Sequence, residues 1–342
     1  MKLIRLPTFS VAVLLCACGV EQVELRPRAT QGGPPVTEPT LTPAGQSLDN
    51  ESAIPAAPVN PSEEIPVVDG IDMPPLGQEP PPLVTGCSKL DLLFVLDNSL
   101  SMFEAQSKVA AAFPALTAAI QEGVRVTDLN ILVTDTDDWD GIGIQLGEND
   151  CEDTLGAGRR SDSDDDDCGI AGSLSHMTST QPELEQTFAC AADVGALGNF
   201  GERTLEAAIQ AVSAPLNTPG ACNAGFSRSD AVLVVVLVTD EDDTLSNGDV
   251  EDWRAELLAA KSGDEDAIVV LALVGDNNID GGLLGGPCSL ATADGAPELQ
   301  RFSQLMPHRA LGSVCAADYA PFFEQSAGVI DAACTAFVVP AP

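Results

Sequence analysis

The chain has 342 residues, of which 15 are Lys or Arg and 52 are Asp or Glu, so its formal net charge at pH 7 is -37. This excess of acid excludes a protein that grips nucleic acid by its phosphates. Hydrophobic residues make up 44% of the chain, which excludes a wholly disordered protein. The length allows one domain of roughly 200 to 250 residues with a tail, or two smaller domains.

Residues 1–17 have the layout of a secretory signal peptide, in which two basic residues precede a short apolar run and then small residues. The run is too short to span a bilayer. The following Leu-Cys-Ala-Cys sequence resembles a bacterial lipobox, and the resemblance implies that Cys18 becomes the diacylated N-terminus of the mature chain. Two acyl chains anchor a protein stably, whereas one binds transiently. The residue after Cys18 is Gly19 and not Asp, which by resemblance to enterobacterial lipoproteins indicates sorting to the outer membrane. We therefore expect a lipid anchor in the outer membrane; ordinary cleavage with release is the alternative.

Residues 18–86 are expected to form a disordered tether between the anchor and a folded domain. Residues 19–86 hold 14 of the 25 prolines and ten acidic residues, but no Phe, Trp or Tyr. Such a composition cannot bury enough surface to offset the entropy of the chain. A chain of this length would hold a domain on the order of 50 Å from the membrane.

From residue 87 onward, apolar runs alternate with amphipathic stretches, which is typical of a parallel sheet covered by helices. The runs predict strands over 90–96, 130–134, 231–238 and 267–274, and helices over 103–121, 183–194, 205–212, 250–261 and 319–336. A third strand is not visible in the pattern and is expected to be a short edge strand. The predicted fold class is α/β, with a doubly wound, mostly parallel sheet flanked by helices in a single domain.

Two of the most apolar predicted strands end in carboxylates. The first strand leads into Asp97-Asn98-Ser99-Leu100-Ser101, and the strand that ends in Val-Thr leads into Asp240. Ligands of doubly wound sheets bind at the carboxyl ends of the strands. A carboxylate there is costly to desolvate unless a cation meets it, and no Lys or Arg lies close in sequence. We therefore expect a metal ion.

This pair of motifs resembles the metal-ion-dependent adhesion site of the von Willebrand factor type A domain. The resemblance covers roughly residues 88–336, within an expected domain of 87–338 that has an acidic insertion at about 135–182. It adds a threonine, for which Thr204 in the sequence GERTLEAAI is the candidate. It implies that Ser99, Ser101 and Thr204 bind the metal directly, while Asp97 and Asp240 hold waters and orient the hydroxyls.

The expected cofactor is Mg²⁺, or Mn²⁺ or Ca²⁺, because such ions take oxygen ligands and Mg²⁺ keeps waters. Two or three neutral hydroxyls leave the ion under-neutralised, so it still seeks an anion. By resemblance, a protein partner supplies that anion as an acidic side chain, which makes the chain a binding and adhesion module and not an enzyme. The alternative interpretation is that Ser99 and Ser101 simply cap the following helix.

Other motifs fail to predict a function. The glycines of GIGIQLG, residues 141–147, have the wrong spacing for a nucleotide loop, so no nucleotide ligand is expected. Asp97 lacks the second aspartate, two residues on, that a phosphoryl-accepting site of the haloacid dehalogenase type would need. The two histidines, His176 and His308, make a hydrolytic triad or a zinc centre improbable.

The stretch from Asp135 to Cys168 has 13 acidic residues and two arginines in 34 residues, but it does not follow the EF-hand pattern. A solvated acidic loop is one interpretation. Weak secondary calcium binding is the other, with these candidate ligands: Asp135, Asp137, Asp138, Asp164 and Asp166. A calcium-binding structural envelope lipoprotein, without a functional adhesion site, is therefore the alternative function.

Removal of Cys16 and lipidation of Cys18 leave eight cysteines, an even number that fits four disulfides in an oxidising envelope compartment. The likeliest local pair is Cys151–Cys168, which would close the acidic insertion. By analogy with extracellular relatives of the von Willebrand type, in which the two ends of the domain are tied together, we expect Cys87–Cys334. The pairs that then remain are Cys190–Cys222 and Cys288–Cys315.

Overall fold

A computed structural model describes residues 86–137, 151, 154–198, 201–276, 288 and 292–340. The chain divides into two units, Met1–Pro74 and Pro75–Pro342. The expected signal peptide, the lipidation site Cys18 and the tether up to residue 85 lie outside the described residues. In the described part, no helix is both long enough and apolar enough to cross a membrane.

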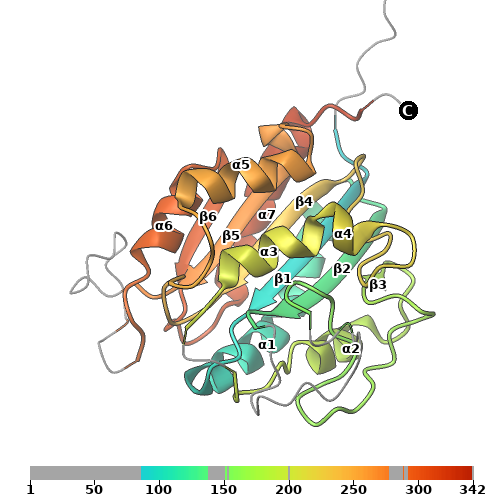
Figure 1. Cartoon of the computed structure of the whole chain (residues 1–342). Coiled ribbons are helices and arrows are strands. Elements are labelled where there is room, and N and C mark those ends of the chain that lie inside the picture. Colours follow the sequence, from blue (N-terminus) through green and yellow to red (C-terminus); the bar gives the residue numbers. More distant parts are fainter. Residues whose placement is uncertain are drawn as a thin grey trace, which may run out of the picture. The chain divides into compact units, whose positions relative to one another are not determined.

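The second unit is an α/β domain built on a six-stranded sheet (Figure 1). Its strands are β1 (Lys89–Leu96), β2 (Asp128–Asp135), β3 (Met177–Thr178), β4 (Val232–Val238), β5 (Ile268–Val274) and β6 (His308–Ser313). Its helices are α1 (Phe103–Gly123), α2 (Leu184–Ala191), α3 (Thr204–Val212), α4 (Ala214–Asn217), α5 (Val250–Ala260), α6 (Pro297–Gln304) and α7 (Ala320–Ala336), with short 3-10 helices at Leu100–Met102 and Glu265–Ala267. The predicted fold class is confirmed.

The strand order is β3-β2-β1-β4-β5-β6, and all neighbours are parallel except β2 and β3. The chain moves outward from β1 to β2 on one side, and then returns to start β4 on the other side of β1. The order of the connections therefore reverses between β1 and β4, which is the position where doubly wound sheets bind ligands.

Both faces of the sheet are buried, which explains why the central strands are continuous apolar runs. Alternate residues of β1 enter two different cores. Phe94 packs edge-on against Phe113 of α1 and Phe188 of α2, while Leu93 and Val95 join the core formed with α3, α5 and α6. The α7 helix lies with α1 on the Phe94 face.

Two parts of the sheet were not predicted from the sequence with their correct positions. The expected short edge strand is β3, which has two residues and pairs antiparallel to β2. The other edge strand, β6, and the preceding helix α6 were missed. The six residues of β6 are only partly buried and include His308 and Arg309, so they form no apolar run.

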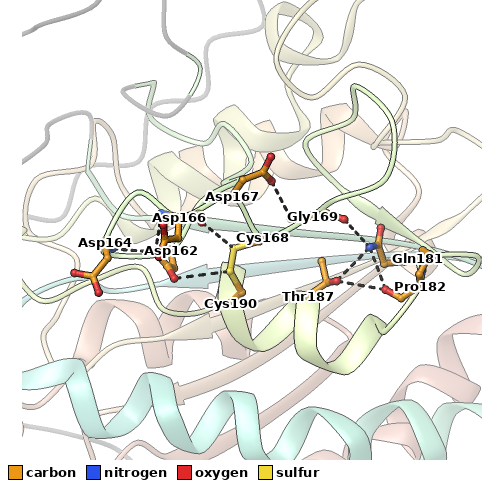
Figure 2. The surroundings of a disulfide bond; sticks show 10 residues. All are labelled: Asp162, Asp164, Asp166, Asp167, Cys168, Gly169, Gln181, Pro182, Thr187 and Cys190. Carbon is orange, nitrogen blue, oxygen red and sulfur yellow. Dashed lines mark hydrogen bonds between the residues drawn. A yellow bond between two sulfur atoms is a disulfide. The ribbon is translucent and has the colours of Figure 1, made fainter.

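Four disulfides join the eight cysteines. The pairs Cys87–Cys334 and Cys288–Cys315 are as predicted. The other two predicted pairs are wrong: the structure has Cys151–Cys222 and Cys168–Cys190. The physical reason is that the acidic insertion folds back onto the domain, so each of its cysteines meets a partner outside it; Figure 2 shows Cys168 joined to Cys190 of α2.

Candidate metal site

The candidate site begins where β1 ends beside β4. The amide of Asp97 continues the strand pairing by donating to the carbonyl of Val238 at 3.0 Å. The Asp97 carboxylate is fully buried and held at both oxygens: Oδ1 accepts from the Ser99 amide at 2.7 Å, and Oδ2 accepts from the Thr239 hydroxyl at 2.6 Å. Because Thr239 directly follows β4, the two strand ends are coupled through this one carboxylate.

The structure brings four of the predicted ligands together. The Ser99 and Ser101 hydroxyls lie 3.1 Å apart, and the Ser101 hydroxyl donates to Oδ1 of Asp240 at 3.2 Å. Asp240 is 139 residues away in sequence, so only the sheet topology makes this contact. The predicted meeting of the β1 and β4 ends is therefore found in the structure.

The serines do not act as helix caps in the described part of the chain. Ser99 precedes the 3-10 helix Leu100–Met102, and Met102 precedes α1, yet neither helix start has a side-chain capping bond. The alternative interpretation, in which these serines are present for capping, is therefore not supported. The Ser99 hydroxyl instead lies against the Ser101 hydroxyl, which donates to Asp240.

Thr204 is the first residue of α3, and its hydroxyl is buried with no hydrogen-bond partner among the described residues. The helix start is held beside β4, because the next amide, that of Leu205, donates to Asp243 Oδ2 at 2.7 Å. A buried hydroxyl without a partner carries a desolvation cost on the order of 1–3 kcal/mol. A bound cation is one contact that would remove this cost.

Glu202 is a member of the site that the sequence did not predict. It is fully buried and lies against Asp97, and neither of its carboxylate oxygens has a partner of hydrogen-bond geometry within the described structure. Burial, and then the charge of Asp97, raise the pKa of Glu202 to about 9. Its position two residues before Thr204 was the only indication in the sequence that Glu202 belongs to the site. A single acidic residue in an amphipathic stretch is too common to be identified as a site residue on that basis.

The site gathers negative charge without a compensating cation. Burial raises the pKa of Asp97, and burial together with the charge of Asp97 raises the pKa of Asp240 to about 6 and that of Glu241 to about 7. Among the described residues, no Lys or Arg is a main influence on these carboxyl groups. Carboxylates that crowd together in this way are stabilised as anions by a cation.

The residues present therefore fit a hard divalent cation. Hydroxyl oxygens of Ser99, Ser101 and Thr204 and carboxylate oxygens of Asp97 and Asp240 are the ligand types that Mg²⁺, Mn²⁺ and Ca²⁺ take. The orphaned Thr204 hydroxyl is the observation that favours such an ion, because nothing else in the described structure satisfies it.

The four acidic residues after β4, Asp240 to Asp243, contact both the candidate site and the starts of two helices. Asp240 and Glu241 face the site, whereas Asp242 accepts from the amides of Glu298 and Leu299 at the start of α6, at 3.2 Å each. Asp243 accepts from the first turn of α3 and from Ser246. The run is therefore a junction between the site and the helix starts around it.

The residues proposed for secondary calcium binding are not brought together as one site. Asp135 is buried and pairs with Arg159 at 2.7 Å, while Asp137 lies close to Asn98 and Gly198. Asp138 lies outside the described residues.

Asp164 and Asp166 are exposed in a different turn, where their amides donate to Oδ1 of Asp162 at 3.0 Å each (Figure 2). The carboxylate of Asp162 thus organises the turn by accepting backbone bonds. This arrangement agrees with the interpretation of a solvated acidic loop.

A further group, Asp276 with Cys288 and Cys315, has the ligand types and proximity of a metal site. The two sulfurs are joined in a disulfide, so neither is available as a thiolate ligand. We do not consider it a metal centre.

No family model and no curated protein matches this chain. Among solved structures, it is similar to proximal thread matrix protein 1 from the mussel byssus, with 12% sequence identity and a TM-score of 0.34. The match covers 73% of this chain and 50% of the other, so the chain spans about half the length of that protein.

Proposed function

We propose that this chain is a lipid-anchored cell-envelope protein whose folded domain, similar to the von Willebrand factor type A domain, binds a protein partner through a divalent cation. The observation that carries the proposal is the set of hydroxyls and carboxylates at the switch point of the sheet. Ser99, Ser101 and Asp240 form one hydrogen-bonded group, beside the doubly held Asp97 and near an unpartnered, buried Thr204 hydroxyl.

In this proposal, Mg²⁺ supplies a positive charge and an open coordination position when it is bound. The hydroxyls of Ser99, Ser101 and Thr204 would hold the ion directly, and Asp97 and Asp240 would orient those hydroxyls and hold waters around it. Thr239 and the Ser99 amide fix the two oxygens of Asp97, so its carboxylate is oriented before any ion arrives. The partner contributes an acidic side chain, and no bond is made or broken.

The anchor at Cys18, the tether and the outer-membrane location complete the proposal and rest on the sequence alone. In this arrangement the tether gives the domain reach from the membrane surface, which suits a module that captures partners.

Isothermal calorimetry with MgCl₂ and, in parallel, with CaCl₂ separates this proposal from a calcium-binding structural lipoprotein. We expect one discrete site that is lost in Asp240→Ala and kept in Asp164→Ala, whose substituted residue is exposed in the acidic turn. Several weak sites that survive Asp240→Ala and disappear with Asp164→Ala and Asp166→Ala would instead support the structural role. Circular dichroism of each variant controls for folding.

Capture from envelope extract tests the binding function itself. We expect a partner that the immobilised wild-type protein retains in MgCl₂ and releases in EDTA, and that the Asp240→Ala protein does not retain. Retention that is indifferent to both EDTA and Asp240→Ala would contradict a cation-mediated contact.

A further inference from the structure

The exposed large apolar side chains of the domain gather around the candidate metal site. In the described residues there are four of them: Leu100, Phe103, Leu197 and Leu245, with exposed fractions of 70%, 68%, 82% and 55%. Single exposed apolar residues are normal on a protein surface, but a group on one face marks an interaction site. The placement of these four is therefore informative.

Two of the four belong to the segment that follows β1. Leu100 stands between Ser99 and Ser101, which are both candidate ligands. Phe103 is the first residue of α1, two positions after Ser101. Both therefore lie directly beside the proposed ion, on the segment that would hold it.

The other two come from separate loops that the fold attaches to the same place. Leu197 precedes Gly198, whose amide donates to the carbonyl of Asn98 at 2.9 Å. The amide of Leu245 donates to the carbonyl of Glu202 at 3.2 Å, and its side chain lies against Gly201. Three separate loops thus each place large apolar side chains next to a segment of the site.

We infer that Leu100, Phe103, Leu197 and Leu245 form an apolar rim around the metal site, and that the partner is a protein segment with one carboxylate flanked by large apolar side chains. This inference rests on the proposed function, because the carboxylate is the group that the ion would take.

The charges of the domain argue for a single carboxylate and for apolar flanks. Asp97, Asp240 and Glu241 lie close enough at the two strand ends to influence one another, and the whole chain carries a net charge of -37. A segment with several acids would be repelled by this face, while one acid can be neutralised by the ion. Uncharged apolar flanks meet the rim without adding repulsion, and burying them provides most of the contact energy.

A random peptide library displayed on phage tests the inference. Selection is on the immobilised full chain in MgCl₂, followed by elution with EDTA. We expect the eluted peptides to be enriched in sequences with one Asp or Glu next to Leu, Ile, Phe or Trp. Enrichment of basic or multiply acidic sequences, or failure to recover any EDTA-eluted sequence, would overturn it.

Variants separate the rim from the metal site. The fourfold variant Leu100→Ser, Phe103→Ser, Leu197→Ser and Leu245→Ser is expected to keep its calorimetric Mg²⁺ binding and to bind the selected peptide at least tenfold more weakly. Leu216→Ser, at a partly buried position on α4 beyond the other end of α3, is a control away from the rim and should change neither. Asp240→Ala should lose both.

Each outcome has one meaning. Normal Mg²⁺ and peptide binding by the fourfold variant would overturn the rim and leave the metal-dependent function intact. A large drop in its melting temperature would also overturn the rim, because the side chains would then be packed in the fold. If the wild-type protein does not bind Mg²⁺ in the calorimeter, the proposed function itself is rejected.

Discussion

The Thr204 hydroxyl is a buried polar group that no neighbouring side chain or backbone group in the described structure satisfies. It is buried, and the described residues offer it no hydrogen bond. The buried Glu202 carboxyl group lies beside Asp97, close to this hydroxyl in sequence. Unsatisfied buried groups such as this hydroxyl are rare in folded proteins and usually indicate a function or an unseen ion.

Thr204→Val tests this residue directly, because valine keeps the shape of threonine and removes only the hydroxyl. We expect the free energy of unfolding without metal to stay the same or to rise by about 1 kcal/mol, since an unsatisfied group is removed. The affinity for Mg²⁺ should fall at least about tenfold, which corresponds to about 1.4 kcal/mol.

Urea denaturation in EDTA gives the free energy of unfolding, and calorimetry with MgCl₂ gives the affinity. Thr204→Ser, which keeps the hydroxyl, is the control. A valine variant that is clearly less stable in EDTA, or that binds Mg²⁺ as tightly as wild type, would contradict the role assigned to Thr204.

His176 makes a separate residue-level prediction about pH. It is buried against Phe226, its Nδ1 atom has no partner in the described structure, and burial lowers its pKa from 6.5 to about 4. Because the folded-state pKa lies below the unfolded value, the contribution of His176 to stability is complete above pH 6.5. It is lost as the pH falls from about 6.5 toward 4.

The loss from this residue alone amounts to about 2 kcal/mol at pH 5. Other groups titrate in the same range, so the measurement is the difference in unfolding free energy between pH 7.5 and pH 5, in wild type and in His176→Gln. We expect the variant to lose about 2 kcal/mol less than wild type. An equal loss in both proteins would show that His176 is not the group responsible.

At the scale of elements, two adjacent aspartates place two helices against the site. Asp243 holds the start of α3, which carries Thr204, and Asp242 holds the start of α6, which carries no candidate ligand. Both helices lack a side-chain cap from their own N-cap residue. The two carboxylates thus perform the same capping task on helices of different importance for the site.

Asp243→Ala and Asp242→Ala form a matched pair for this reason. Each should lower the free energy of unfolding by about 1–2 kcal/mol, which is the usual cost of a lost helix cap. Only Asp243→Ala should also weaken Mg²⁺ binding, because only α3 positions Thr204. Equal Mg²⁺ affinities in the two variants, measured by calorimetry, would show that the start of α3 does not contribute to the site.

The elements that the sequence predicted well are those whose pattern reflects burial on both sides. The β4 run VLVVVLV is fully buried, and it was recognised within one residue of its bounds. The edge strand β6 was missed because it borders solvent and its half-buried residues have mixed character. An edge strand pairs with a neighbour on one side only, and its other side borders solvent. Its residues are therefore less buried and do not form the continuous apolar run that marks a central strand in the sequence.

The site divides in the same way. Asp97, Ser99, Ser101 and Asp240 could be predicted because each follows a recognisable strand, and parallel strands end at the same edge of the sheet. Glu202 could not, because no strand precedes it and its burial depends on how the loop before α3 folds. The pairing of Cys168 with Cys190, and not with Cys151, likewise depends on the path of the insertion, to which sequence distance is no guide.

On the scale of the whole molecule, the fold concentrates its uncompensated charge at one place. Two other buried carboxylates are paired with basic side chains: Asp91 contacts both Arg228 and Lys261 near the start of β1, and Asp135 contacts Arg159. At the switch point, the described residues offer no such partner to Asp97, Glu202 or Asp240. The carboxylates at the switch point therefore differ from Asp91 and Asp135 in lacking a basic side chain, and we expect a cation from solution to take that place.

The most direct test of this account is a crystal structure of the domain grown with MnCl₂, with anomalous scattering recorded near the manganese absorption edge. The account predicts one strong anomalous peak within bonding distance of the hydroxyls of Ser99, Ser101 and Thr204, which disappears in crystals of Asp240→Ala. A domain that crystallises in MnCl₂ with no peak there, or with peaks only at the exposed turn around Asp164 and Asp166, would contradict it.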